Sequence, residues 1–189
     1  MKKNLGAKTA LYPMPVLIIA TYDKDGMPDA MNAAWGGISD TNEIGICLSK
    51  EHKTVANILE RKAFTVSVAD VENLVACDYV GIVSANDVKD KIERSGFHCT
   101  KSDFVDAPLI DELKFTLECE LISYDEKTSH LYGKIVNLSV DTSILDDKDN
   151  VDLQKFKPIT YDPVNHNYLE LGPVAGRAFA SGLVLKNKN

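Results

Sequence analysis

Runs of apolar residues along the chain predict short β-strands joined by tight turns. Residues 14–22 form a continuous apolar run of strand length, and the Asp-Gly pair that follows is typical of a hairpin turn. The segments 43–49 and 64–70 are short and rich in β-branched residues, which also favours strands. Between them, residues 54–62 carry apolar side chains at helical spacing. The first part of the chain is therefore predicted to fold as a strand pair followed by strand, helix and strand.

The most regular alternation begins at residue 114. Between residues 114 and 121, apolar and polar side chains alternate, which predicts a strand with one buried face and one face in water. The side chains expected to face water are those of Lys114, Thr116, Glu118 and Glu120. A polar turn at residues 125–128 and a second strand-like segment follow. Residues 114–140 are therefore predicted to form a long antiparallel hairpin.

The remaining segments add short helices and irregular structure. Two short helical stretches are predicted around residues 81–86, and the second ends at Gly96, where a left-handed C-cap belongs. Residues 141–160 are charged and irregular, which predicts a solvated loop or short helix, and the tail from residue 168 is apolar and interrupted by glycines. Many short strands, few short helices and no regular strand–helix alternation favour a mainly β fold. The expected architecture is an antiparallel barrel with peripheral short helices rather than a doubly wound sheet.

The composition is that of one ordinary globular domain. A length of 189 residues is enough for one substantial core and short for two, so residues 1–189 are predicted to form a single domain. The chain is 44% hydrophobic and 26% charged, and its net charge is −7. An acidic balance of this size opposes non-specific binding to nucleic acid or anionic lipid. No nucleic-acid partner is therefore expected, and any anionic ligand needs a local site.

Three further features favour a cytoplasmic location. No apolar run approaches the roughly 20 residues that a membrane helix needs, so no membrane span is expected. The N-terminal segment has a basic start but lacks the cleavage site of a signal peptide. The four cysteines are widely spaced, which favours reduced, buried thiols; they are Cys47, Cys77, Cys99 and Cys119. We therefore expect a cytoplasmic protein without a membrane partner.

The clearest candidate for a ligand site lies at the start of the predicted helix 54–62. Thr54 occupies the expected N-cap, and the N–H groups of a first helical turn carry partial positive charge. Ser49, His52 and Lys53 lie just upstream and add a hydroxyl, a titratable ring and a cation. Together these groups form a candidate phosphate site. The alternative is that Thr54 only caps the helix while His52 and Lys53 are solvated.

Other patterns that carry chemistry are missing from the sequence. It contains neither a Gly-x-Gly-x-x-Gly motif after a strand nor a Walker loop, so a bound nucleotide needs another device. The cysteines and the four histidines lack the spacing of a metal site. No catalytic triad or carboxylate pair is apparent. We therefore predict no metal and no catalytic side chain.

Five short motifs occur in an order that resembles a known family. They are YPMPVLIIAT, NAAW, LSKEHKT, ACDYVGIVSANDVKDK and LECEL. In this order they resemble the flavin reductase-like, flavoredoxin-type family of split-barrel proteins that bind FMN, and the resemblance covers residues 12–182. It implies an antiparallel split β-barrel with its core in that range. It also implies a homodimer with one FMN near each dimer interface.

The resemblance implies where the cofactor lies. The phosphate of FMN would sit at the Thr54 helix, beside Ser49, His52 and Lys53, and the flavin ring would lie along residues 31–36. In that segment Asn32 would hydrogen-bond the flavin, and Trp35 would lie against or beside the ring. The small residues Ala33 and Ala34 would let the backbone approach a flat ligand closely. For Trp35 the alternative is an ordinary core tryptophan.

Four residues further along the chain complete the implied cofactor site. Ser84 would reach the ribityl chain or the phosphate. Lys91 would lie near the phosphate or the electron-rich edge of the ring, and its alternative is an exposed lysine paired with Asp87. His130 would donate to a ring carbonyl, although a surface histidine is the alternative. Tyr161 would flank the ring, although core or interface packing explains it equally well.

The implied function is that of an FMN-binding oxidoreductase of the flavin reductase type. Hydride from NADH or NADPH would pass to FMN, and the electrons would leave to a second flavin, a quinone or a protein acceptor. The alternative is a flavoredoxin-like electron carrier with little NAD(P)H activity. A third interpretation is a split-barrel protein that has lost the cofactor and serves structurally.

Overall fold

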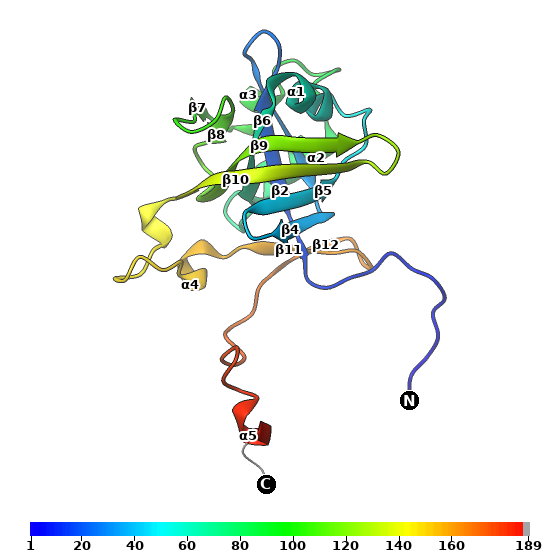
Figure 1. Cartoon of the computed structure of the whole chain (residues 1–189), viewed down its shortest axis with the longest axis vertical. Coiled ribbons are helices and arrows are strands. Elements are labelled where there is room, and N and C mark those ends of the chain that lie inside the picture. The colour runs from blue at the N-terminus through cyan, green and yellow to red at the C-terminus, as the bar shows by residue number, and fades with distance from the viewer. Residues whose placement is uncertain (187–189) are drawn as a thin grey trace.

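A seven-stranded antiparallel sheet forms the centre of the computed structural model, which describes residues 1–186 (Figure 1). The strand order is β3-β2-β6-β9-β10-β5-β4. These strands are β2 (Leu17–Tyr22), β3 (Pro28–Ala33), β4 (Gly36–Asp40), β5 (Glu43–Cys47), β6 (Ala63–Val68), β9 (Phe115–Asp125) and β10 (His130–Val140). The expected mainly β, antiparallel fold is confirmed.

Smaller sheets and short helices surround this sheet. One sheet joins β1 (Met14–Pro15), β11 (Ile159–Asp162) and β12 (Asn167–Glu170), and another joins β7 (Cys99–Lys101) and β8 (Pro108–Ile110). The helices are α1 (Lys53–Arg61), α2 (Leu74–Ile82), α3 (Lys91–Ser95), α4 (Leu153–Phe156), α5 (Leu183–Lys186) and a 3₁₀ turn, η1 (Thr142–Ile144). The expected helices before and after residues 81–86 are confirmed, as is the left-handed C-cap at Gly96, with φ 81°.

The sheet is curled, because its two edges are consecutive in the chain. Strands β3 and β4 lie at opposite ends of the strand order, yet only residues 34 and 35 connect them. The two edges must therefore come close together. A Cβ atom built on Gly36 of β4 would lie 3.0 Å from the Leu17 side chain of β2, five positions away in the sheet. The sheet is thus an open barrel with peripheral helices.

Strand β2 is buried on both of its faces, which explains its continuous apolar sequence. Ile19 points into the barrel and packs in one cluster with Phe64. Ile18 points the other way and packs in a second cluster with Val80 of α2. Helix α1 contributes Val55 to the inner cluster, so its apolar face covers part of the barrel interior. The position of α1 is therefore fixed by core packing.

The hairpin of β9 and β10 is confirmed, but the expected solvent-facing side of β9 is partly wrong. Thr116 and Glu118 are buried rather than in water. Ser102, Asn137 and Ser139 donate hydrogen bonds to the Glu118 carboxylate. Burial alone would raise the pKa of Glu118, but these donors hold it below its usual value. A single strand's pattern does not reveal that another segment, here the one carrying Ser102, covers its polar face.

The two ends of the chain extend away from the sheets (Figure 1). Apolar side chains of the C-terminal segment, including Val174 and Phe179, are exposed. The expected loop at residues 141–160 contains η1 and α4. Among residues 1–186, no helix combines the length and apolar character that crossing a bilayer requires.

The cysteines are all free thiols, and their burial differs. Cys77 and Cys119 are buried as expected, and burial raises the pKa of each thiol to about 12. Cys47 and Cys99 are only partly buried. A thiol whose pKa is about 12 is protonated at neutral pH, so Cys77 and Cys119 act as small apolar core residues.

We expect Gly133→Ala to destabilise the fold. A Cβ atom at Gly133 would lie 2.3 Å from Cζ of Phe64, a fully buried ring in the inner cluster. Overpacking of this kind costs about 1–3 kcal/mol of unfolding free energy. Urea denaturation followed by circular dichroism measures it. The matched control is Gly37→Ala in β4, where nothing lies within 4 Å of the added atom. Equal midpoints for the two variants would contradict the proposed packing.

Candidate functional site

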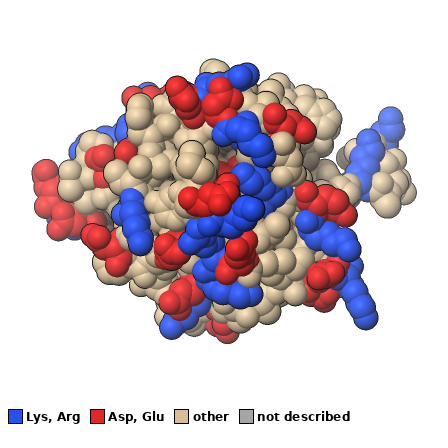
Figure 2. Space-filling view, turned by 90° about the horizontal axis from the view of Figure 1, so that it is seen from above, with Lys and Arg blue, Asp and Glu red and all other residues tan. Residues whose placement is uncertain are grey.

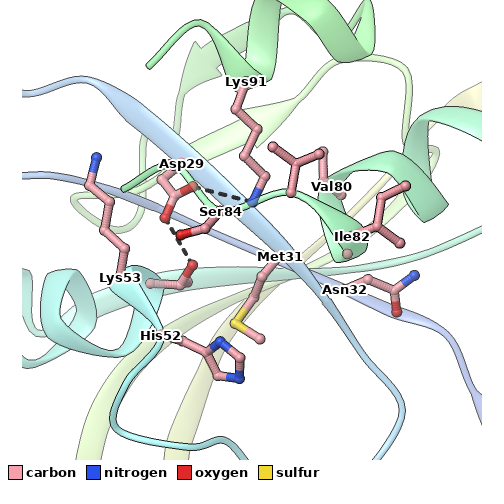
Figure 3. A pocket seen from close by; sticks show the side chains of 13 residues that line it. Asp29, Met31, Asn32, His52, Lys53, Val80, Ile82, Ser84 and Lys91 are labelled. Carbon is pink, nitrogen blue, oxygen red and sulfur yellow. Dashed lines mark hydrogen bonds and ion pairs between the residues drawn. The ribbon is translucent and has the colours of Figure 1, made fainter. Parts of the chain in front are cut away.

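A cavity of about 260 Å³ lies between the start of α1, strand β3 and the connection from α2 to α3 (Figure 3). We call it the α1 cavity. Six residues singled out from the sequence line it: Asn32, His52, Lys53, Thr54, Ser84 and Lys91. These side chains are as far apart as 59 positions in the sequence, and the fold brings them to one place.

The N-terminus of α1 opens toward this cavity without a side-chain cap. The helix begins at Lys53, and the N-cap residue is His52, whose side chain makes no capping hydrogen bond. The expected N-cap role of Thr54 is therefore wrong, because Thr54 lies inside the first turn. The first N–H groups of a helix have no partner within the helix. No acidic side chain occupies the first turn, so the partial positive charge of this end remains available to an anion.

The Thr54 hydroxyl is engaged inside the protein. Thr54 is buried, and its Oγ1 donates to Oδ2 of Asp29 at 2.9 Å. A hydroxyl has one hydrogen, and that of Thr54 is donated to Asp29. Toward a ligand, the Thr54 hydroxyl can therefore act only as a hydrogen-bond acceptor. Any hydrogen bond that Thr54 gives to a phosphate must therefore come from its backbone N–H.

Asp29 also pairs with Lys91 at the floor of the α1 cavity (Figure 3). The Lys91 Nζ donates to the carbonyl oxygen of Ala30 at 2.6 Å and lies 3.7 Å from Oδ1 of Asp29. Lys91 is only 3% exposed. Burial lowers the pKa of Lys91, and the Asp29 charge opposes that shift. The expected alternative, an exposed lysine paired with Asp87, is wrong.

Lys53 carries a second ion pair at the mouth of the α1 cavity. Its Nζ lies 3.1 Å from Oδ2 of Asp23, in the turn between β2 and β3. Positive and negative side chains are interleaved over the face seen from above (Figure 2). The ammonium groups of Lys53 and Lys91 are thus paired with carboxylates, while the helix N-terminus has no side-chain cap.

A second cavity of about 410 Å³ adjoins the first and shares three of its lining residues. We call it the Tyr161 cavity, and the two cavities together the groove. Both are lined by Asn32, Gly81 and Ile82. The Tyr161 cavity adds Ala33, Ala34, Asp78, Tyr161, His166 and Tyr168. The two adjoining cavities therefore extend from the α1 N-terminus to the small residues at the end of β3.

Asn32 is fixed where the two cavities meet. Its Nδ2 donates to the backbone oxygen of Cys77 in α2 at 3.1 Å. A Cβ atom on Gly81 would lie 2.8 Å from Cβ of Asn32, so only glycine allows α2 to approach β3 this closely. The side-chain oxygen of Asn32 remains as an acceptor for a ligand.

Trp35 and His130 lie together in a different hollow, of about 560 Å³. Its described lining residues all differ from those of the groove. Trp35 is 56% exposed, so the alternative of a core tryptophan is wrong. The rings of His130 and Tyr132 stack with centroids 6.4 Å apart. We call this hollow the Trp35 surface.

Ser49 does not join the other candidates. Its hydroxyl donates to the Glu51 carboxylate, and it lines neither the α1 cavity nor the Tyr161 cavity.

Two residues of the cavities, Asp29 and His166, were not identified from the sequence. Asp29 stands in a polar turn sequence, and His166 follows an irregular segment, so neither position carried a periodic signal.

The comparison with protein families gives a match to the flavin reductase like domain over residues 9–163. Among solved structures, flavoredoxin of Desulfovibrio vulgaris (Miyazaki F) is 36% identical. It superimposes with a TM-score of 0.91 over 96% of this chain and 100% of that chain.

Two further structures show the same fold at lower identity. Flavoredoxin from Methanosarcina acetivorans is 24% identical, with a TM-score of 0.87 over 98% of this chain and 99% of that chain. An FMN-binding domain of a flavin reductase-like enzyme from Shewanella baltica OS155 is 19% identical. Its TM-score is 0.78, over 86% of this chain and 88% of that chain. The split-barrel fold expected from the sequence is confirmed.

We expect Thr54→Val to destabilise the fold, because it leaves Oδ2 of the buried Asp29 without its donor. The two side chains are nearly isosteric, so the expected loss of about 1–3 kcal/mol reflects the unpaired oxygen and not a cavity. Urea denaturation measures it. Thr41→Val, at an exposed turn position, is the control and should leave the midpoint unchanged. An unchanged midpoint for Thr54→Val would show that the hydroxyl is not needed by Asp29.

Proposed function

We propose that this chain, which belongs to the family of flavin reductase-like domains, binds FMN in the groove and passes electron pairs through it. The observation that carries the proposal is that the two cavities adjoin and share Asn32, Gly81 and Ile82. One end is an uncapped helix N-terminus, and the other is walled by small residues. This combination suits a ligand with an anionic end and a flat end.

The α1 cavity fits the phosphate end of FMN. The N–H groups of Lys53 and Thr54 open the helix, and the Ser84 hydroxyl lies across the same cavity. Backbone N–H groups at a helix N-terminus bind phosphate oxygens without any charged side chain having to move. We therefore assign His52, Lys53, Thr54 and Ser84 to the phosphate, and place Ser49 outside it.

The strand end at residues 32–34 fits the flat end. Ala33 and Ala34 present little side chain to the Tyr161 cavity, so a ring can approach the backbone. Asn32 offers its oxygen as an acceptor from a position held by α2. Tyr161 lines the same cavity. When bound, FMN supplies the hydride and single-electron chemistry, and these residues bind and orient it.

We assign Lys91 a supporting role rather than direct contact with the ring. Its ammonium already donates to Ala30 and faces Asp29. Both groups are nearly free of solvent contact. Their pairing holds α3 against β3 and keeps the floor of the α1 cavity close to neutral.

The proposal includes a homodimer in which a second copy covers the Trp35 surface. Trp35 and Ile38 are exposed, by 56% and 67%, and β4 is an edge strand of the sheet. Exposed apolar side chains along an open strand edge favour burial against a partner. In such a dimer, Trp35 and His130 approach the flavin ring from outside the groove. The free thiols support a cytoplasmic location for this assembly.

We expect Lys53→Glu to weaken FMN binding more than riboflavin binding. The substitution places a negative charge in the first turn of α1, where it competes with the phosphate. The dissociation constant for FMN should rise about tenfold or more, which corresponds to about 1.4 kcal/mol. The constant for riboflavin, which lacks the phosphate, should change little.

Quenching of flavin fluorescence measures both dissociation constants. Lys127→Glu is the matched control, because it makes the same charge change at an exposed turn between β9 and β10. Equal weakening of FMN and riboflavin by Lys53→Glu would contradict the phosphate assignment. Failure of the wild-type chain to bind FMN would contradict the proposed function.

The finer proposal is that NADH or NADPH reduces the bound FMN. Anaerobic mixing of the FMN-loaded protein with either nucleotide should bleach the flavin absorbance within seconds. The alternative is an electron carrier, whose FMN would resist both nucleotides but accept electrons from a reduced ferredoxin-type protein. The flavoredoxin neighbours are the reason to keep this alternative. Stopped-flow absorbance with both kinds of donor decides between the two.

A further inference from the structure

The last part of the chain forms an arm that extends away from its own fold (Figure 1). We call residues 172–186 the C-terminal arm; it follows β12 and ends with α5. Within the described chain, the hydrogen bonds of these residues all stay inside the arm. Its large apolar side chains are exposed, namely Val174, Phe179, Leu183, Val184 and Leu185. Apolar side chains gathered in this way mark an interaction site.

A hydrogen-bonded turn presents Phe179 in the middle of the arm. The carbonyl oxygen of Arg177 accepts the N–H of Ser181 at 2.9 Å and the Ser181 hydroxyl at 2.8 Å. The same hydroxyl oxygen accepts the N–H of Arg177 at 2.9 Å. Phe179 lies between these two residues with φ 59°, and its side chain is 104% exposed. The turn therefore holds a phenyl ring outward in a fixed shape, which lowers the entropic cost of binding.

The arm also differs from the rest of the chain in charge. Residues 171–189 contain three basic side chains, Arg177, Lys186 and Lys188, and no acidic one. The whole chain has a net charge of −7, so residues 1–170 carry −10. A basic arm is attracted to a surface as acidic as that of residues 1–170. An anionic membrane would instead repel the acidic part of the chain to which the arm is attached.

The Trp35 surface offers a hollow that suits the exposed phenyl ring. Its volume is about 560 Å³, and the rings of Trp35, His130 and Tyr132 line it. Aromatic rings pack favourably against one another. No carboxylate or ammonium group is among the described residues that line the hollow, so a phenyl ring entering it displaces no ion pair.

The residues beside this hollow are acidic, whereas those beside the phenyl ring are basic. Asp40 ends β4 and Glu43 begins β5, so two carboxylates flank the turn next to the hollow. Arg177 stands two positions before Phe179, and Lys186 ends α5. An apolar centre with a charged rim is the usual anatomy of a protein interface. The arm and the Trp35 surface are therefore complementary in both respects.

We propose that the C-terminal arm of one copy docks on the Trp35 surface of a second copy, with Phe179 in the hollow beside Trp35. The inference rests on the homodimer of the proposed function and names the segment that holds it together. The contact is reciprocal, because two identical copies each offer one arm and one surface. The resulting dimer covers both hollows and leaves neither arm in water.

The first test measures the oligomeric state of the full chain. Sedimentation velocity of the wild type at micromolar concentration should show a dimer. Phe179→Ser should raise the dimer dissociation constant about tenfold or more, because an aromatic anchor is lost from the interface. Its circular dichroism should match that of the wild type, because Phe179 is fully exposed within one copy.

The matched control is Met27→Ser. Met27 is 60% exposed in the turn before β3 and lines a different hollow. This substitution also replaces an exposed apolar side chain by serine, and it should leave the dimer dissociation constant unchanged.

The second test maps the contact with native thiols. Cys47 lines the Trp35 surface, and Cys99 lines the hollow that contains Met27. Oxidation of Phe179→Cys with diamide should join the introduced thiol to Cys47 of the second copy. A non-reducing gel should then show a band of twice the chain mass. Adding Cys47→Ser should abolish this band, and adding Cys99→Ser should not. Wild type oxidised in parallel shows what the native thiols form alone.

Four outcomes would overturn the inference. A monomeric wild type removes the dimer and the arm contact together. A dimer that Phe179→Ser leaves intact, or a disulfide to Cys99 in place of Cys47, removes the arm from the Trp35 surface. The fourth is a monomeric wild type that co-sediments with vesicles of equal parts phosphatidylcholine and phosphatidylserine, and loses them in Phe179→Ser. Lipid would then be the occupant of the arm.

The flavin titration of the proposed function stays a separate measurement. None of the positions varied in these tests lines the groove, so FMN binding should be retained in each variant. Failure of the wild type to bind FMN, with the dimer and its disulfide intact, overturns the proposed cofactor and supports the arm contact.

Discussion

The groove depends on the buried carboxylate of Asp29. It accepts the Thr54 hydroxyl of α1 and faces the Lys91 ammonium of α3, so one side chain of β3 fixes two helices. Removing one partner of a buried ion pair typically costs about 3–5 kcal/mol, because the other charge is left uncompensated. Core packing places α1 over the barrel. The hydrogen bond from Thr54 to Asp29 then fixes the position of the first turn of α1 relative to β3. The proposed anion site depends on both constraints.

The pairing of lysines with aspartates determines which groups can supply positive potential to the α1 cavity. Lys91 is balanced by Asp29 and Lys53 by Asp23, and burial further lowers the pKa of Lys91. The N–H groups of the first turn of α1 are fixed by the helix and carry no counter-charge. A phosphate would therefore meet donors that are already oriented, which costs little reorganisation. Specificity for a phosphate then comes from backbone geometry more than from lysine charge.

The curl of the sheet gives one short segment two environments. Because β3 and β4 are opposite edges joined by two residues, the chain leaves the groove at Ala34 and reaches the outer face at Trp35. Ala33 and Ala34 therefore line the groove, while Trp35 and His130 share the Trp35 surface. A ligand in the groove and a partner on the Trp35 surface would therefore both contact residues 31–36.

The sequence by itself determined the strand pair at the start of the chain, the strands on either side of α1, the long hairpin of β9 and β10, and helices α1, α2 and α3. It also identified nine of the twenty residues that line the groove. The alternation at 114–121 and the glycine at 96 act through the nearest few residues, so they were predictable. Only the tertiary structure decided the partners of buried polar groups: Glu118 is covered by the segment of Ser102, and the Thr54 hydroxyl belongs to Asp29. It also separated Trp35 from the groove and paired Tyr161 with His166. Such partners come from segments distant in the chain, whose meeting depends on how the whole sheet curls, and no local pattern records that.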